Sequence, residues 1–245
     1  MYAVWSYIQT SVFCLYACYL CIFAIVGHKY LYRQEKPSHY PTHVAIIPDG
    51  NRRHALSKYR EKLMGYKYGG LLFTKVIQWA STSNVKELSL YAWSEENWSR
   101  PQKEINTMLN AVEKQLDLWN ASPPAPNVRF HFVSTSSHKV PKNVRDKMKQ
   151  LQKTSKNNTG VMVYIYFSYG FNKEPKQKDH FLPKTASHPD LLIRTGGEKR
   201  LSNFCMSQLV YTELCFVDDL FPHCNDTTWN HCVKEYNKRN RNYGH

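Results

Sequence analysis

The alternation of short apolar runs with longer segments of helical spacing is the feature that most constrains this chain. A short apolar run between turn formers is typical of a buried strand, whereas apolar residues three and four apart are typical of an amphipathic helix. Strands that alternate with helices predict an α/β fold, in which helices flank a mainly parallel sheet. Six strands are predicted, at residues 43–47, 86–93, 127–134, 160–167, 191–193 and 213–217.

Between these strands the spacing of apolar residues predicts helices at residues 63–81, 101–119, 142–153, 202–210 and 226–240. Residues 170–188 are rich in lysine, proline and histidine without any periodicity, which predicts a loop. Apolar residues make up 42% of the chain, enough for one sizeable core. We therefore expect a single domain over residues 37–245.

The chain begins with an uncharged segment. Residues 4–27 contain no Asp, Glu, Lys or Arg, and they are long enough to cross a bilayer as a helix. Lys29, Arg33 and Lys36 follow, and the positive-inside rule would keep the rest of the chain in the cytosol. We predict a single-pass membrane anchor over residues 1–36. A cleaved signal peptide and a buried core helix are the alternatives.

The composition narrows the class of partner. A formal net charge of +14 implies a negative partner: nucleic acid, an anionic membrane surface or a phosphate-rich substrate. The basic residues are scattered and no nucleic-acid module signature occurs, so we predict no nucleic-acid partner. The seven cysteines form no CxxC pair, and His223-Cys224 with His231-Cys232 lack a standard zinc spacing. Reduced thiols in a cytosolic domain are the simpler account.

The stretch at residues 188–204, HPDLLIRTGGEKRLSNF, has the residue types of an anion site. Its apolar run ends at Ile193, and Arg194, Thr195 and two glycines follow. Glycines let backbone N–H groups approach a ligand, arginines match phosphate oxygens, and Ser202 is suited to cap a helix. In α/β proteins ligands bind just past the carboxyl ends of strands. The alternative is a solvated turn before a capped helix.

The strand at residues 43–47 ends in a second polar segment, PDGNRR. Asp49 at the strand end and Asn51 at the start of a helix make a place for a metal ion and a phosphate. The reason is that a helix N-terminus offers free N–H donors and the positive end of a dipole, to which Arg53 adds charge. A helix that is merely capped is the alternative.

The strand at residues 86–93 leads into a third polar segment, SEENWSRP. Ser94, Asn97 and Arg100 follow a strand end, so they are again positioned to bind a ligand. Trp98, taken alone, is better explained as a packing residue.

The three segments stand in the fixed order HVAIIPDGNRRHA, LYAWSEENWSRP and DLLIRTGGEKRLSNF followed by YTEL. Together they resemble the cis-prenyltransferase family, the undecaprenyl and dehydrodolichyl diphosphate synthases, over residues 43–245. The resemblance implies a sheet-and-helix fold that encloses a hydrophobic tunnel and is usually dimeric. It also implies an Mg²⁺-dependent enzyme. Such an enzyme adds isopentenyl diphosphate in cis geometry to an allylic diphosphate such as farnesyl diphosphate, which yields dolichol or undecaprenol precursors.

The resemblance further implies roles for individual residues. The catalytic residues would be Asp49, Asn51, Ser94 and Asn97, and the metal ligands would be Asp49 and Glu213. Arg53 and Arg100 would grip the allylic diphosphate, whereas Arg194 and Ser202 would hold the isopentenyl diphosphate. The full set of implied substrate-binding residues is Gly50, Arg52, Arg53, Lys62, Trp98, Arg100, Arg194, Glu198, Arg200 and Ser202.

Some positions depart from the family pattern. Lys62 and Tyr66 stand where the family usually has an arginine and a histidine, and lysine is a point charge without a planar fork. The segment at residues 170–188 is shortened, and Asn242 replaces the arginine of an arginine-x-glycine ending. These departures leave an alternative open, a non-catalytic membrane-anchored partner subunit of the Nogo-B receptor type. The resemblance implies a homodimer or a heterodimer at the membrane, in the endoplasmic reticulum, with its catalytic domain in the cytosol.

Overall fold

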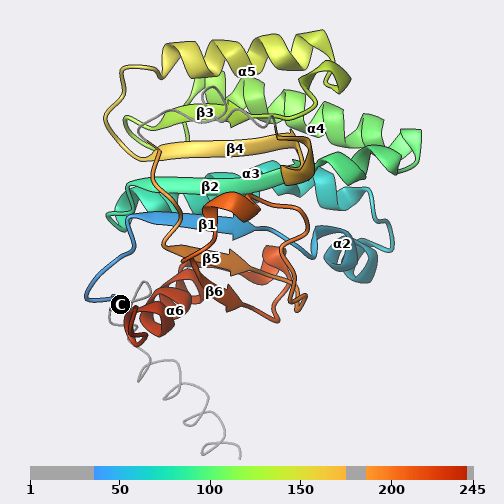
Figure 1. The fold of residues 1–245 in the computed structure, drawn as a ribbon. Helices are drawn as coiled ribbons and strands as arrows, with labels where there is room; N and C mark the ends of the chain where they lie inside the picture. The colour runs from blue at the N-terminus through green and yellow to red at the C-terminus, as the bar shows by residue number, and fades with distance from the viewer. Residues whose placement is uncertain (1–35, 175–185, 242–245) are drawn as a thin grey trace, which may run out of the picture. The chain divides into compact units, whose positions relative to one another are not determined.

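In the computed structural model, which describes residues 36–174 and 186–241, six strands form one parallel sheet (Figure 1). The order across the sheet is β3-β4-β2-β1-β5-β6, and every neighbouring pair runs parallel. The predicted six-stranded parallel sheet is therefore confirmed. The strands are β1 (His43–Ile47), β2 (Glu87–Ser94), β3 (Arg129–Val133), β4 (Met162–Tyr169), β5 (Leu191–Arg194) and β6 (Glu213–Phe216).

Four of the helices predicted from apolar spacing are confirmed, and the helix expected to start at Asn51 is confirmed as well. The α-helices are α2 (Asn51–Tyr59), α3 (Met64–Thr82), α4 (Gln102–Ala121), α5 (Lys142–Thr154) and α6 (Asp226–Asn237). Short 3-10 turns are η1 (Glu95–Ser99), η2 (Ser137–Lys139), η3 (Phe171–Lys173), η5 (Met206–Gln208) and η6 (Phe221–His223).

The helix predicted at residues 202–210 is wrong. Only the single turn η5 forms there, because Ser202, Asn203 and Cys205 have φ angles of 51°, 62° and 43°. A left-handed backbone cannot continue a right-handed helix.

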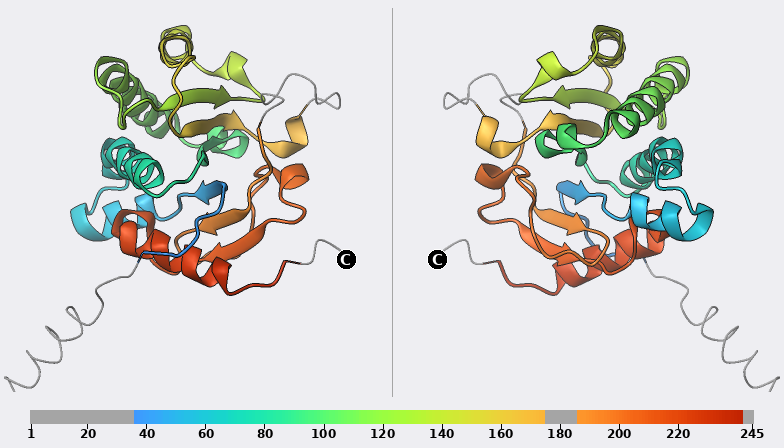
Figure 2. Two further views of the ribbon diagram at one scale, coloured as in Figure 1. Left: turned by 90° about the vertical axis from the view of Figure 1, so that its left-hand side faces the viewer. Right: turned by 90° about the vertical axis from the view of Figure 1, so that its right-hand side faces the viewer.

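The two faces of the sheet are covered differently. On one face, Ile46 and Leu90 of the strands pack with Ile77 of α3 and Met108 of α4. On the other face, Tyr166 and its neighbours pack against the segment around η5. Figure 2 shows α3 and α4 on the first face and η3 and η5 on the second. The prediction of helices along the sheet is thus confirmed for one face, whereas turns and loops cover much of the other.

The strand order places the carboxyl ends of β1 and β5 side by side. β1 lies inside the sheet; β2, β4 and β3 continue on one side of it, and β5 and β6 on the other. Ile47, the last residue of β1, pairs with Arg194, the last residue of β5. A crevice outside the strand ends, at the point where the strand order reverses, is the usual ligand site of an open α/β sheet.

The predicted membrane anchor requires a correction. Within residues 36–174 and 186–241, none of the helices combines the length and the apolar character needed to cross a membrane. The single-pass anchor and the membrane location are therefore not supported. The segment at residues 4–27, on which that prediction was based, lies outside the described residues. The division of the chain at residue 36 stays a prediction.

Trp229 on α6 offers a test of how the described core holds together. Its side chain is 2% exposed, and its ring centre lies 6.2 Å from Trp79 and 6.1 Å from Phe221. We expect Trp229→Ala to lower the free energy of unfolding by about 3–5 kcal/mol, because the removed ring leaves a cavity. Urea unfolding of the full chain measures this. Leu118→Ala, whose side chain is 62% exposed, is the matched control, and an equal loss in both variants would contradict the packing described here.

Candidate active site

The carboxyl edge of the sheet holds a pocket of about 620 Å³ where the ends of β1, β2 and β5 meet the start of α2. The pocket brings together most of the predicted site residues from three separate segments of the sequence. Those that line it are Asp49, Gly50, Asn51, Arg52, Arg53, Ser94, Asn97, Arg100, Arg194, Arg200 and Ser202.

Asp49 and Arg194 form the centre of this pocket. Arg194 Nη2 donates to Asp49 Oδ2 over 2.9 Å, and its Nη1 donates to Ser202 Oγ over 2.7 Å. Arg53 Nη2 lies 3.4 Å from Asp49 Oδ1. Thr195 joins the two strand ends: its hydroxyl donates to Asp49 O and accepts from Asp49 N, both over 2.9 Å. Asp49 is therefore held by two arginines and by a fixed backbone.

Two glycines make this close arrangement possible. Gly50, the residue before α2, has a φ of 109°, and Gly196 has a φ of 87°. A Cβ atom at Gly196 would lie 2.6 Å from Arg53 Nη2 and 3.1 Å from Asp49 O. A side chain there would push Arg53 and Asp49 away, so the glycine is required by the close approach as well as by its φ angle.

The start of α2 adds polar groups to the pocket. The first N–H groups of a helix have no intrahelical acceptor and carry the positive end of its dipole, which favours anions. Asn51 Oδ1 and Arg194 Nε are both buried, and neither has a hydrogen-bond partner among the described residues. Buried polar atoms of this kind are rare in folded proteins, and a ligand would give them partners.

Glu104 on α4 contacts three side chains of the pocket wall, and we did not predict it. Its carboxylate, 7% exposed, lies 3.1 Å from Arg52 Nε and 3.3 Å from Arg100 Nη1. It also accepts a 2.5 Å hydrogen bond from the hydroxyl of Tyr66. The sequence did contain a signal for this role: Glu104 precedes the buried residue Met108 by four residues, so both lie on the same face of α4. A carboxylate on an apolar face needs cationic partners.

The pocket is strongly positive. Arg52, Arg53, Arg100, Arg194 and Arg200 line it, and planar guanidinium groups bind phosphate oxygens in pairs. Burial raises the pKa of two tyrosines on the pocket wall, Tyr66 and Tyr91, well above the usual range. The hydrogen bond to Glu104 raises the pKa of Tyr66 further, and the negative charge of Glu96 raises the pKa of Tyr91 further. Both phenols therefore stay neutral and act as hydrogen-bond donors.

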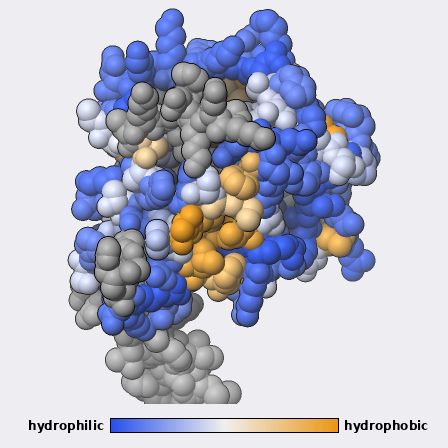
Figure 3. Space-filling view, in the orientation of Figure 1, coloured by the Kyte–Doolittle hydropathy of each residue, from blue (hydrophilic) through white to orange (hydrophobic). Residues whose placement is uncertain are grey.

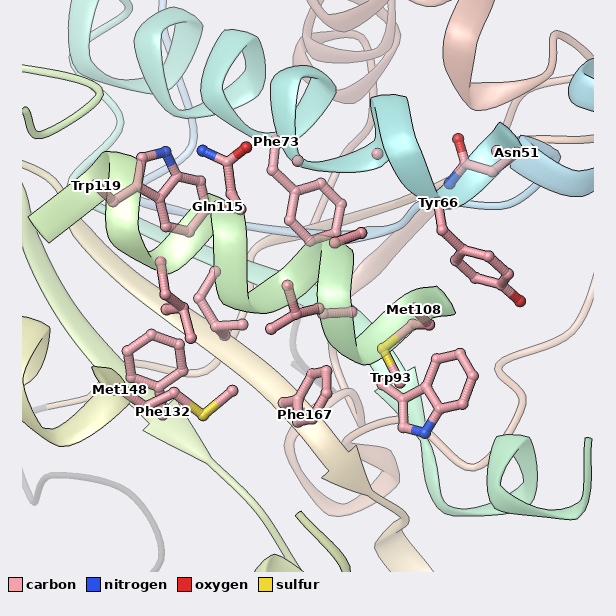
Figure 4. Close-up of a pocket in the computed structure, with 18 residues that line it drawn as sticks. Asn51, Tyr66, Phe73, Trp93, Met108, Gln115, Trp119, Phe132, Met148 and Phe167 are labelled. Atoms are coloured by element: carbon pink, nitrogen blue, oxygen red, sulfur yellow. The ribbon is translucent and has the colours of Figure 1, made fainter. Parts of the chain in front are cut away.

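An apolar cavity of about 120 Å³ lies next to the polar pocket, between α3, α4 and the sheet (Figure 4). Phe73, Val112, Trp119, Phe132 and Phe167 are among its lining side chains, and it lies where the predicted tunnel requires an apolar space. A cavity of about this size holds a benzene-sized group, which leaves room for roughly one five-carbon unit. Longer chains would require flexible lining side chains, such as methionine, to move.

Four predicted site residues do not line the pocket. Lys62 is exposed in the turn between α2 and α3. Trp98 packs on Trp93 with ring centres 5.8 Å apart and donates to Ser168 Oγ, as a packing residue would. Glu198 forms an ion pair with Arg200.

Glu213, the second predicted metal ligand, lies at the edge of the sheet opposite Asp49. It is the first residue of β6 and pairs with Leu191, the first residue of β5, so it lies at the amino edge. Its carboxylate there pairs with Arg239 Nη1 over 2.7 Å. Within this chain, Glu213 therefore does not join Asp49.

The fold and the pocket define the class of protein. An α/β sheet carries an arginine-rich anion site at its switch point, and an apolar cavity begins beside that site. Such a site suits a molecule with a phosphorylated head and an apolar tail.

Comparison with known proteins gives the family. Residues 47–178 and 173–244 match the family described as "Putative undecaprenyl diphosphate synthase". An isoprenyl transferase of Oceanobacillus iheyensis is 33% identical over 83% of this chain and 90% of its own length. A (2E,6E)-farnesyl-diphosphate-specific ditrans,polycis-undecaprenyl-diphosphate synthase of Pasteurella multocida is 31% identical over 85% of this chain and 96% of its own length.

Solved structures agree. Lavandulyl diphosphate synthase from Lavandula x intermedia, in complex with dimethylallyl diphosphate, superposes with a TM-score of 0.75 at 25% identity, over 84% of this chain and 99% of that one. A probable undecaprenyl diphosphate synthase from Campylobacter jejuni gives a TM-score of 0.68 at 25% identity, over 84% of this chain and all of the other. The chain belongs to the undecaprenyl diphosphate synthase family, the cis-prenyltransferases, and it is a prenyl transferase enzyme.

Proposed function

We propose that this enzyme condenses isopentenyl diphosphate with an allylic diphosphate, farnesyl diphosphate, and forms a polycis-polyprenyl diphosphate. In this reaction the bond between the allylic carbon and the diphosphate oxygen breaks, and diphosphate leaves with the bonding electrons. The allylic carbon forms a bond to the terminal carbon of the isopentenyl unit, and the isopentenyl unit then releases a proton to a base or to water. The supporting observation is the position of the arginine-rich pocket directly beside the apolar cavity, with Asn51, Tyr66, Ala92 and Trp93 lining both.

The pocket has room for separate roles. In this proposal Arg53, Arg100 and the start of α2 bind the allylic diphosphate, and Arg194, Arg200 and Ser202 bind the isopentenyl diphosphate. Arginines held in place stabilise the negative charge that grows on the departing diphosphate, without any rearrangement during the reaction. Holding the two substrates in register contributes a large share of the rate by itself.

We propose Mg²⁺ as the cofactor, held by Asp49 together with substrate oxygens. No group of three or more His, Cys, Asp or Glu side chains that could hold a metal ion occurs in the described part of the chain. Mg²⁺ commonly binds through one or two carboxylates plus substrate phosphates, so one partly exposed aspartate fits that mode. When bound, the ion would neutralise charge on the departing diphosphate.

We also propose that the working enzyme is a dimer, with a second copy or a related subunit. Figure 3 shows an apolar patch at the centre of the face on which η5 lies. Met206 and Val210, in and just after η5, are 48% and 69% exposed. An exposed apolar patch of this kind often marks a protein interface.

The test is incorporation of labelled isopentenyl diphosphate into a lipid-extractable product by the purified full chain. We expect product with farnesyl diphosphate and Mg²⁺, and a loss of at least about 100-fold when EDTA removes the metal, because the growing charge is no longer neutralised. Re-addition of Mg²⁺ should restore the rate. Light scattering on the same sample shows whether the chain pairs with itself. Absence of product from the chain alone, followed by product on addition of a related subunit, would favour a heteromer.

A further inference from the structure

Tyr66 stands at the junction between the two halves of the site. It lies in the first turn of α3 and lines both the polar pocket and the apolar cavity. Figure 4 shows its ring at the end of the cavity near Asn51, with the hydroxyl directed away from Phe73 and Trp119. The ring therefore faces the apolar space while the hydroxyl belongs to the polar pocket.

The hydroxyl of Tyr66 connects two charged groups. It donates to Glu104 Oε1 over 2.5 Å and accepts a hydrogen bond from Arg100 Nη1. Because burial raises the pKa of Tyr66, the phenol keeps the proton that it donates to Glu104. Hydrogen bonds to charged partners are the strong ones among side-chain contacts.

Arg100 is the group that this hydroxyl holds. Its guanidinium carbon lies 5.0 Å from the ring centre of Trp93 and its Nη1 lies 3.3 Å from Glu104 Oε1. With one face on an indole ring and one edge on Glu104 and Tyr66, the arginine has a fixed orientation in the pocket wall. An arginine that is oriented before a ligand arrives loses less entropy on binding it.

We propose that Tyr66 is the positioning residue of the allylic substrate: its hydroxyl orients Arg100 for the allylic diphosphate, and its ring forms the wall along which the allylic chain enters the apolar cavity. This inference rests on the proposed function. It assigns to Tyr66 an effect on the allylic substrate alone, because the hydroxyl of Tyr66 is bonded to Glu104 and Arg100, whereas Arg194 and Ser202, the groups proposed for the isopentenyl diphosphate, are bonded to each other.

Calorimetric binding of each substrate in Mg²⁺-containing buffer tests the role without requiring turnover. Tyr66→Phe keeps the ring and removes the hydroxyl. We expect the Kd for farnesyl diphosphate to rise about tenfold, the effect of one hydrogen bond to a charged group, and the Kd for isopentenyl diphosphate to change by less than about twofold. The matched control is Tyr68→Phe on the same helix, since that side chain is 40% exposed and stacks on Tyr59.

A double-mutant cycle then shows whether Tyr66 acts through Arg100. In an Arg100→Met background we expect the added change Tyr66→Phe to weaken farnesyl diphosphate binding by less than about twofold, because the group that it orients is gone. Equal effects in both backgrounds, a Tyr66→Phe variant that binds like Tyr68→Phe, or a parallel loss for both substrates would each overturn the inference. Failure of the proposed function has a different signature: the unaltered chain binds no farnesyl diphosphate and yields no product.

Discussion

Replacing Asp49 with asparagine is expected to lower the rate of isopentenyl diphosphate incorporation by about 10³-fold, which corresponds to ~4 kcal/mol of lost transition-state stabilisation. Asparagine keeps the size of the side chain and its ability to accept from Arg194, but it removes the negative charge. That charge is needed twice in the proposed reaction. It binds Mg²⁺ beside the diphosphates, and it pairs with Arg194 and Arg53 across the pocket.

The loss should be one of activity and not of fold. The side chain of Asp49 is 33% exposed, and the backbone contacts of Asp49 with Thr195 do not involve the carboxylate. The melting temperature should therefore change by only a few degrees.

Asp190→Asn is the matched control for Asp49→Asn. Asp190 precedes β5 at the opposite edge of the sheet, where its carboxylate accepts from His43 N over 3.0 Å and lies 3.4 Å from Arg241 Nη1. Like Asp49, it is thus a carboxylate at a strand end that lies beside an arginine. If the Asp49→Asn variant kept more than about a tenth of the unaltered rate, Asp49 would not be a metal ligand, because the charge of a ligand contributes several kcal/mol at such a site.

The fold was readable from the sequence to the extent that local patterns determine it. The end of β1 at Ile47 followed from a short apolar run before polar residues and glycine, and the end of β5 was predicted one residue early, at Ile193. The order of the strands did not, since the pairing of β1 with both β2 and β5 depends on contacts between distant segments. The resemblance to a known family added the expectation of an apolar tunnel beside the sheet, but it gave no strand order.

The differences between the predictions and the structure have identifiable physical causes. The segment from Ser202 to Val210 contains apolar residues at plausible helical spacing, but three left-handed residues give turns instead. Tertiary contacts overrode local propensity there. Glu213 was assigned to the metal from a motif, and the parallel direction of β6 places the start of that motif at the opposite edge. The position of a residue along its strand decides at which edge of the sheet it lies, and a sequence motif alone does not give that position.

Glu104 shows what sequence reasoning tends to miss. Acidic residues in helices are usually solvent-exposed, so the residue type alone did not mark the glutamate near the start of α4 as a buried partner of the site. Its function as a partner becomes visible only when Arg52 from α2 and Tyr66 from α3 are seen to reach it. Sites assembled by several helices are harder to predict than sites assembled within one loop.

Replacing Arg194 with lysine is the second change with a large expected effect. We expect kcat/KM for isopentenyl diphosphate to fall about 10²-fold, the cost of losing one strong hydrogen bond to a charged diphosphate. Lysine keeps the positive charge but not the planar fork. The fork is what allows a single side chain to reach Asp49 Oδ2 through Nη2 and both Ser202 Oγ and the carbonyl of Arg200 through Nη1. A single ammonium group cannot hold these three positions together.

Arg239→Lys separates the role of the site from the general cost of exchanging arginine for lysine. Arg239 also bridges a carboxylate and a carbonyl, donating to Glu213 Oε2 over 2.7 Å and to Leu214 O over 3.0 Å, but it does so at the amino edge of the sheet. We expect the Arg239→Lys variant to react at a rate within about twofold of that of the unaltered enzyme, because a partly exposed ion pair contributes little to stability. Equal losses in both variants would mean that arginine supports the fold at either edge, and the assignment of Arg194 to the isopentenyl diphosphate would then be wrong. A loss confined to Arg194→Lys, with KM for farnesyl diphosphate unchanged, would place the fork on the isopentenyl side of the pocket.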